Sequence, residues 1–327
     1  MTSRPATRSP PAASSPHRLD QLVEQARRHA PLRTVVVHPV DAVSLMGAIE
    51  AERAGLITPV LVGPERRIRA AARAARIDLT GRTIVATEHS HAAAAQAVQL
   101  ARRGEADAIM KGALHTDELM HCVIDPDCGL RTERRVSHIF AIDAPHYPRL
   151  LFITDAAVNI YPSLEDKRDI VQNAIDLARA LGVRTPHVAL LSAVELVTPK
   201  IKSTLDAAAL CKMADRGQIT GGILDGPLAF DNAVSRAAAA TKAITSRVAG
   251  RADIFVVPDL EAGNMLAKQL EYLAGARLAG IVLGARVPIM LTSRADDARS
   301  RLASCAIATL YAARAGKIRR LTATTVT

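Results

Sequence analysis

The chain has 327 residues, and its 42 lysines and arginines against 32 acidic residues give a formal net charge of +10. Its length predicts about two domains, and 49% hydrophobic with 23% charged residues is typical of a globular protein. No run of 18 apolar residues is present to cross a membrane. The positive charge favours polyanionic partners such as nucleotides or phosphates, whereas 2% aromatic residues argue against stacking on single-stranded nucleic acid.

Apolar, β-rich runs alternate with Ala-rich helical stretches along the chain. Strands are predicted over residues 34–38, 59–62, 83–86, 108–110, 137–142, 150–154, 187–191, 219–225, 254–257, 278–283 and 289–291. Helices are predicted over 41–54, 65–76, 90–103, 164–181, 203–216, 231–242, 261–273 and 293–312, with Asp41 and Ser163 as N-caps. This alternation predicts an α/β fold with a mostly parallel sheet covered by helices. Segment 124–135 breaks the pattern and reads as a basic loop.

The N-terminal segment and the cysteines indicate the setting of the protein. Residues 1–18 lack the apolar region of a secretory signal and predict a disordered tail. Four cysteines, at positions 122, 128, 211 and 305, form no CxxC pair, so they predict neither a zinc site nor a disulfide framework. We therefore expect a cytoplasmic protein without a metal centre.

Candidate binding residues follow the predicted strands, because ligands in open α/β sheets bind beyond the carboxyl ends of strands. Lys111 and Gly112 follow one strand, and Thr116 is a possible cap of a next helix, although this segment alone is better explained as an ordinary turn with a solvated lysine. Asp155 and Asn159 follow another strand, and both side chains readily satisfy turn backbone instead.

Two basic segments complete the candidates. The loop with Arg131, Arg134 and Arg135 suits a phosphorylated ligand because guanidinium groups fork onto phosphate oxygens, but a basic surface loop explains it as well. Ser293 and Asp296 form a helix capping box without any function. Arg294 is harder to explain, since a cation is disfavoured in a first helical turn unless an anion lies there.

Together these segments resemble the phosphate acetyl/butyryltransferase family, most of all its phosphate butyryltransferase-like branch. The resemblance runs from about residue 30 to near the end of the chain. The resembling blocks are KGxxHT at 111–116, GLRTERRVSHI at 129–139, ITDAAVNIYP at 153–162, ALLSAVELVTPK at 189–200, STxDAAxLCKMADRGQI at 203–219, LDGPLAFDNAVS at 224–235, VPDLEAGNMLAKQL at 257–270 and GIVLGARVPIMLTSRADD at 280–297.

The resemblance implies an acyltransferase that converts acyl-CoA and phosphate into acyl phosphate and CoA, with short acyl groups from acetyl to butyryl. It also implies a two-domain fold of the isocitrate/isopropylmalate dehydrogenase type with the active site in the interdomain cleft. Residues 19–143 and 285–327 would form the first, discontinuous domain, and residues 144–284 the second. A homodimer, functional pairing with an acyl kinase, and no tightly bound cofactor are implied as well.

Site residues carried over from the family fall into a catalytic set and a substrate-binding set. Arg294 would hold the phosphoryl group, and Ser293 would hydrogen-bond the CoA sulfur or the developing oxyanion. The general base stays open between Asp296 and Asp297, because Ser300 stands where the acetyl-specific branch has an Asp. The implied substrate-binding residues are Lys111, Gly112, Arg131, Arg134, Ser137, Asp155 and Asn159.

Two other activities are open on the same fold group. One is an acyl-carrier-protein:phosphate acyltransferase, whose acidic carrier would suit the +10 charge. The other is an NAD-dependent decarboxylating dehydrogenase, which usually needs a metal held by clustered Asp residues, and the sequence has no matching cluster. Neither nucleic acid nor a membrane is an expected partner.

Overall fold

The strands of the described residues join in one eleven-stranded sheet. The structure is a computed structural model that describes residues 17–291 and 297–324, with side-chain surroundings as far as Arg314. The strand order is β3-β2-β1-β4-β11-β10-β5-β6-β9-β7-β8. The strands are β1 (Leu32–Val37), β2 (Ile57–Gly63), β3 (Thr83–Ala86), β4 (Ala108–Lys111), β5 (Ser137–Asp143), β6 (Leu151–Thr154), β7 (His187–Leu191), β8 (Ile223–Leu228), β9 (Ile254–Val256), β10 (Arg277–Leu283) and β11 (Ile289–Met290).

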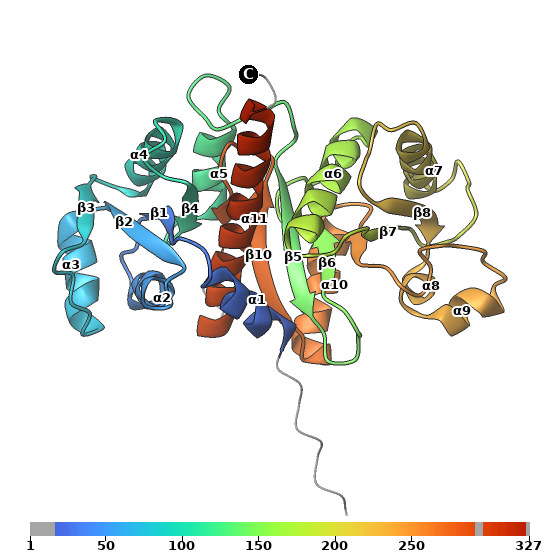
Figure 1. Cartoon of the computed structure of the whole chain (residues 1–327), viewed down its shortest axis with the longest axis horizontal. Coiled ribbons are helices and arrows are strands. Elements are labelled where there is room, and N and C mark those ends of the chain that lie inside the picture. Colours follow the sequence, from blue (N-terminus) through green and yellow to red (C-terminus); the bar gives the residue numbers. More distant parts are fainter. Residues whose placement is uncertain (1–16, 292–296, 325–327) are drawn as a thin grey trace, which may run out of the picture.

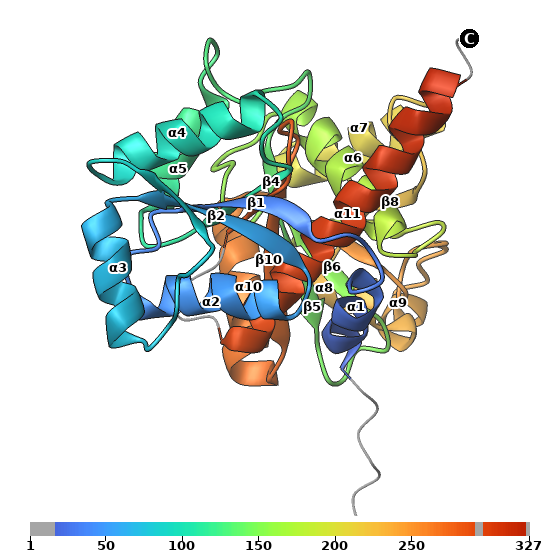
Figure 2. The ribbon, with the colours of Figure 1, turned by 60° about the vertical axis from the view of Figure 1, so that its left-hand side comes forward.

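Helices cover both faces of this sheet, as Figures 1 and 2 show. The predicted α/β fold with a mostly parallel, helix-covered sheet is therefore confirmed. The helices are α1 (Arg18–Ala26), α2 (Ala42–Arg53), α3 (Glu65–Ala74), α4 (Ser90–Arg102), α5 (Thr116–Ile124), α6 (Leu164–Ala180), α7 (Lys202–Asp215), α8 (Phe230–Val234), α9 (Arg236–Thr241), α10 (Leu260–Ala274) and α11 (Ala298–Thr324).

Three antiparallel pairings at the centre reverse the direction of the strands. β10 pairs antiparallel with β11 and with β5, and β5 pairs antiparallel with β6. The remaining pairings are parallel. Because three reversals separate β11 from β6, the block β3-β2-β1-β4-β11 runs opposite to the block β6-β9-β7-β8. The carboxyl ends of the strands in the two blocks, where ligand sites are expected, therefore point in opposite directions along the sheet.

The core follows from strands that are apolar on both faces. Val35, Val36 and Val37 of β1 are fully buried, which is typical of a parallel strand between two helix layers. Val36 packs with α1, α2 and α11, whereas Val35 and Val37 pack with α4 on the opposite face. The strand thus places successive side chains in two separate clusters.

The last helix returns to the N-terminal half of the chain. α11 packs against α1, α2 and β10, and Gly47 of α2 allows the approach, since a Cβ there would lie 2.8 Å from Cδ of Arg301. Figure 2 shows α11 crossing the sheet beside α1. The division of the chain into two domains stays a prediction, because one continuous sheet spans both proposed units.

The sequence located most elements, and the caps show why. Asp41 accepts a hydrogen bond from the backbone N–H of Ser44 at 2.8 Å and begins α2. Ser163 and Asp166 exchange the two bonds of a capping box at the start of α6, with N···O distances of 3.0 and 3.1 Å. Both caps are therefore confirmed as predicted.

Several elements differ from the prediction. The helix expected over 231–242 is two helices, because Ser235 is extended and caps α9 instead of continuing α8. The strand expected from residue 219 begins at Ile223, since Gly221 takes a positive φ of 84° that belongs to a turn. Thr116 is the first residue of α5, with His115 as its N-cap. Helix α1 was not predicted at all.

Candidate active site

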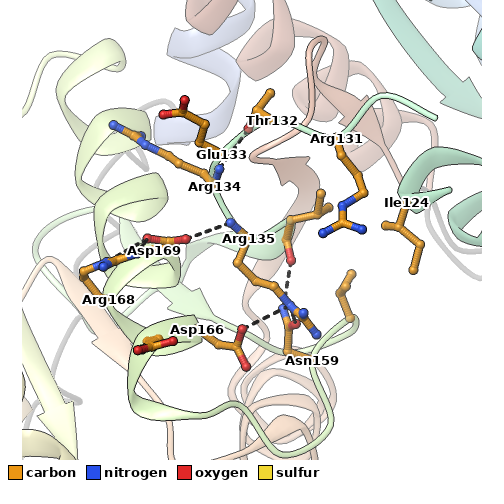
Figure 3. Close-up of a pocket in the computed structure, with 13 residues that line it drawn as sticks. Ile124, Arg131, Thr132, Glu133, Arg134, Arg135, Asn159, Asp166, Arg168 and Asp169 are labelled. Atoms are coloured by element: carbon orange, nitrogen blue, oxygen red, sulfur yellow. Dashed lines mark hydrogen bonds and ion pairs between the residues drawn. The ribbon is translucent and has the colours of Figure 1, made fainter. Parts of the chain in front are cut away.

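A pocket of about 420 Å³ lies beside the start of β5, between the loop after α5 and the first turns of α6 (Figure 3). Its volume is in the range of small-molecule sites. Among the predicted substrate-binding residues, Arg131, Arg134 and Asn159 line it. The full lining is Ile124, Arg131, Thr132, Glu133, Arg134, Arg135, Val136, Val158, Asn159, Glu165, Asp166, Arg168 and Asp169.

The pocket is balanced in charge rather than uniformly basic, because four arginines and four acids line it. Nη1 of Arg134 lies 2.5 Å from Oδ2 of Asp176, outside the lining. Nη2 of Arg168 lies 2.9 Å from Oδ1 of Asp169. These two guanidinium groups are therefore already engaged by carboxylates.

Arg131 is the contrasting case. Its side chain is exposed, and it makes no hydrogen bond or ion pair with another residue of the described chain. Only its backbone is held, through a β-bridge to Ala285. Figure 3 shows its guanidinium turned toward the pocket, across from Arg168. Arg131 therefore offers an available cation to a bound anion.

Asp155 is a buried organiser of the turn after β6. The residue is 3% exposed, and its carboxylate accepts hydrogen bonds from the backbone N–H groups of Ala157 at 2.9 Å, Val158 at 3.0 Å and His138 at 3.2 Å. It also accepts from Nδ2 of Asn159 at 2.5 Å. In this structure Asp155 thus accepts the hydrogen bonds of backbone N–H groups in the turn.

Asn159 connects this buried network to the pocket. Its Nδ2 also donates to the carbonyl of Val136 at 2.9 Å, and its Oδ1 accepts from Nε of Arg135 at 2.7 Å. Ser137 lies directly behind, fully buried, and its hydroxyl accepts from Nδ2 of Asn173 at 2.9 Å. Ser137 therefore fixes the loop to α6 rather than facing the pocket.

Lys111 and Gly112 lie at another place in the fold. Nζ of the buried Lys111 donates to the carbonyls of Gly112 at 3.3 Å and Leu114 at 3.0 Å. A Cβ at Gly112 would lie 2.4 Å from the carbonyl oxygen of Val37, so this glycine permits the close approach of the chain to β1. Three strands separate β4 from β6, which places Lys111 about 19 Å from Asp155 at the usual strand spacing.

The start of α11 lies nearer the far end of β5. Oδ1 of Asp297 accepts from the backbone N–H of Ser300 at 2.7 Å, as an N-cap does. Burial raises the pKa of Asp297, but the bonds from Ser300 and the charges of Arg277 and Arg299 outweigh it and lower the pKa. Arg277 pairs with Asp143 at the end of β5, roughly 20 Å from the strand's first residue at 3.3 Å per residue.

Three of the four predicted catalytic residues, Ser293, Arg294 and Asp296, lie outside the described residues. The chain before them is placed, because Met290 of β11 pairs with Met110 of β4. The chain therefore leaves β11 beside Lys111. Among the described residues, the substrate-binding candidates thus fall into a group at the start of β5 and the pair Lys111 and Gly112 at the end of β4, and the catalytic assignments stay predictions.

Sequence reasoning missed the residues of α6 that shape the pocket. Asp169 accepts from the backbone N–H of Arg135 at 2.9 Å, and Nδ2 of Asn173 donates to the carbonyl of Arg135 at 2.9 Å. Asp166, Asp169, Asn173 and Asp176 recur at helical spacing and so share one face of α6. This polar face could have been found from the sequence, because nothing apolar interrupts it.

Two absences concern the described part of the chain. No group of three or more His, Cys, Asp or Glu side chains within residues 17–291 and 297–324 is arranged to hold a metal ion. No described helix is both long and apolar enough to cross a membrane.

The α/β fold is of the type found in solved phosphotransacylases. A branched-chain phosphotransacylase from Enterococcus faecalis V583 is similar with a TM-score of 0.74 and 28% identity, over 86% of this chain and 99% of the other. A phosphotransacetylase from Streptococcus pyogenes shares the fold with a TM-score of 0.76 and 21% identity, over 90% and 99%.

Sequence comparison gives the family. The model described as "Phosphate acetyl/butaryl transferase" matches residues 82–309. A phosphate acetyltransferase of Rhizobium meliloti is 63% identical over 92% of this chain and 95% of its own length. A phosphate butyryltransferase of Clostridium acetobutylicum is 39% identical over 90% and 97%. The chain belongs to the phosphate acetyl/butyryltransferase family, as the sequence motifs predict.

Proposed function

We propose that this protein is a phosphate acyltransferase that interconverts acyl-CoA plus phosphate with acyl phosphate plus CoA. The observation that carries this proposal is the 63% identity to a phosphate acetyltransferase over nearly the full length of both chains. Because phosphate acetyltransferase relatives reach 57–63% identity and phosphate butyryltransferase relatives 39–50%, acetyl-CoA is the preferred substrate of this proposal. The exposed guanidinium of Arg131 in the pocket supports it, since both substrates carry phosphate groups.

The reaction is a direct acyl transfer in a ternary complex. A phosphate oxygen attacks the thioester carbonyl, the C–S bond breaks, and CoA leaves as a thiolate that takes up a proton. In the reverse direction the CoA thiol loses its proton and attacks the acyl phosphate carbonyl. Arg294 stabilises charge on the phosphoryl group, Ser293 hydrogen-bonds the sulfur or the oxyanion, and Asp296 or Asp297 is the candidate base.

The wider assignment is part of the same proposal. The fold is of the isocitrate/isopropylmalate dehydrogenase type, with a cleft between two domains and a homodimeric assembly. The protein acts in the cytoplasm without a tightly bound cofactor, beside an acyl kinase that consumes the acyl phosphate. An elongated acyl-CoA would reach from the pocket of Arg131 toward the end of β4, which accounts for two separate groups of candidate residues.

The experiment is a thiol-release assay with acetyl-, propionyl- and butyryl-CoA, each with and without phosphate. We expect phosphate-dependent thiol release that is fastest with acetyl-CoA. Absence of phosphate-dependent thiol with all three substrates would overturn the proposal. Activity only with acyl groups on an acyl carrier protein would favour the related carrier-protein enzyme.

A further inference from the structure

Arg135 is the pocket residue whose position is most closely determined by its neighbours. Its backbone N–H donates to Oδ2 of Asp169 at 2.9 Å, and its carbonyl accepts from Nδ2 of Asn173 at 2.9 Å. Both partners belong to α6. The backbone of Arg135 is therefore clamped between two side chains of a single rigid helix.

The side chain of Arg135 is held through only one of its three nitrogens. Nε donates to Oδ1 of Asn159 at 2.7 Å, and Oδ1 of Asp166 lies 3.4 Å away. The side chain is 53% exposed, and its two terminal nitrogens make no hydrogen bond with another described residue. Figure 3 shows the side chain extending along the pocket to Asn159. The terminal nitrogens are the pair of donors that forks onto two oxygens of a phosphate.

Asn159 can hold Arg135 in only one way. Its Nδ2 is committed to Asp155 at 2.5 Å and to the carbonyl of Val136 at 2.9 Å. The amide is 3% exposed and so is Asp155, so a flip of the amide would turn its oxygen toward a buried carboxylate. The Oδ1 atom must therefore face Nε, and the buried Asp155 fixes the direction of the exposed arginine.

Arg134, the neighbouring arginine, behaves differently. Its Nη1 lies 2.5 Å from Asp176, and Figure 3 shows its side chain directed away from Arg131 and Arg135. Arg168 likewise has one terminal nitrogen paired with Asp169. Arg131 and Arg135 are thus the two pocket arginines with both terminal nitrogens unengaged by described residues, and Arg135 is the one that is held in advance.

We propose that Arg135 binds a phosphate oxyanion of the substrates together with Arg131, and that Asn159 and Asp155 are positioning residues that hold it ready. This inference rests on the proposed acyltransferase function and adds a binding residue to it. The oxyanion belongs either to the phosphate substrate or to the phosphate groups of CoA. Preorganisation lowers the entropy cost of binding, because the side chain is already ordered before the ligand arrives.

Steady-state kinetics of Arg135→Gln test the proposal and separate the two sources of the oxyanion. We expect the KM of one substrate to rise roughly 10- to 100-fold, the loss expected for a charge-assisted hydrogen bond. A rise in KM for phosphate alone identifies the phosphate substrate, and a rise for acetyl-CoA alone identifies the CoA phosphates. Arg135→Lys, which keeps the charge without the fork, should lie between Arg135→Gln and the wild type.

Arg184→Gln is the matched control. Arg184 is exposed in the turn before β7, so this variant loses the same charge far from the pocket lining and should keep both KM values within about twofold of the wild type. If Arg135→Gln also stays within twofold for both substrates, or lowers only kcat, the proposal is overturned. A wild-type protein without phosphate-dependent activity would instead contradict the proposed function itself.

The positioning role has its own readout. Asn159→Ala should raise the same KM as Arg135→Gln, and the double variant should be no worse than Arg135→Gln alone, because both remove one interaction. Inorganic phosphate binding, followed by calorimetry, gives the same comparison without turnover if phosphate is the ligand. Additive effects of the two substitutions on KM would mean that Asn159 supports the fold and does not position Arg135.

Discussion

Hydrogen-bond partners decide what each candidate residue can contribute. Asp155 and Ser137 use their polar atoms on the loop and on α6, so both act behind the pocket. Arg131 and Arg135 differ in this respect, since their terminal nitrogens remain for a ligand. The sequence showed three arginines in one loop but not which of them Asp176 and Asn159 would engage, because both partners come from segments distant along the chain.

Arg294 is the residue on which the catalytic assignment depends. We expect Arg294→Ala to lower kcat at least roughly a hundredfold, because a cation that stabilises charge developing in the transition state is lost. Arg184→Ala is the control, since Arg184 is exposed in the turn before β7 and lines no part of the pocket. Near-normal turnover of Arg294→Ala would show that this arginine is only structural.

His138 makes the stability of the protein depend on pH. Burial lowers the pKa of this histidine to about 4, although the charge of Asp155 opposes the shift. A pKa below the unfolded value of about 6.5 means that the unfolded chain binds more protons between these limits. This contribution to stability is therefore present above pH 6.5 and is lost as the pH falls toward 4.

His138→Phe removes that titration and keeps a large ring beside Phe140. The free energy of unfolding of the wild type should fall by roughly 2 kcal/mol more than that of the variant between pH 7 and 4.5. Urea unfolding at both pH values measures the difference. Equal losses in the two proteins would mean that His138 is not the titrating group.

Helices were predictable from the sequence wherever a local capping residue marks their boundary. Asp41 and Ser163 mark the starts of α2 and α6 through their own side chains. Helix α1 lacked such a signal, since His17 makes no side-chain cap bond, and it is stabilised by distant contacts. Nη1 of its Arg18 lies 2.7 Å from Asp143, and its Asp20 binds Arg277 at 2.8 to 2.9 Å.

Leu19 measures how much α1 contributes, because it is fully buried in the cluster that includes α11. We expect Leu19→Ala to lower the free energy of unfolding by about 2–5 kcal/mol, the usual cost of a buried leucine. Leu273→Ala is the matched control, because Leu273 is 84% exposed at the end of α10, and it should cost less than about 0.5 kcal/mol. Similar losses in the two variants would show that α1 is not integral to the core.

A substitution at Gly112 tests whether the backbone after β4 must lie close to the end of β1. Gly112→Ala would bring a Cβ to 2.4 Å from the carbonyl oxygen of Val37, and the backbone must shift, at a cost of about 2–4 kcal/mol. Gly104→Ala has open space around it but a φ of +72°, so it should cost only about 1 kcal/mol. Thermal unfolding of both variants gives the comparison, and a smaller loss at Gly112 would contradict it.

The whole molecule shows what the sequence could not specify. Alternating strands and helices predict the α/β class, but the order of eleven strands depends on antiparallel pairings between β10, β5 and their neighbours. The β10–β5 pairing joins residues more than 100 positions apart, and no local pattern encodes it. The same reversals make the carboxyl ends of the two blocks of strands point in opposite directions. They also separate Lys111 from the pocket of Arg131.

The net charge of +10 does not arise from the pocket. The pocket holds four arginines and four acids, so the excess charge lies elsewhere on the described surface or in the terminal segments. Recognition of phosphate therefore depends on which guanidinium groups keep terminal donors rather than on the total charge. Weak dependence of both KM values on ionic strength up to 0.2 M would agree with this local binding.

The central claim is that acyl groups pass from CoA to phosphate, and the amounts of the two products test it most directly. Acetyl-CoA, phosphate and the protein are incubated together, and free thiol and acetyl phosphate, trapped as the hydroxamate, are measured in the same samples. The account predicts equal amounts of thiol and acetyl phosphate, with neither formed when phosphate is omitted. Thiol without acetyl phosphate would show hydrolysis instead of transfer and would contradict the account.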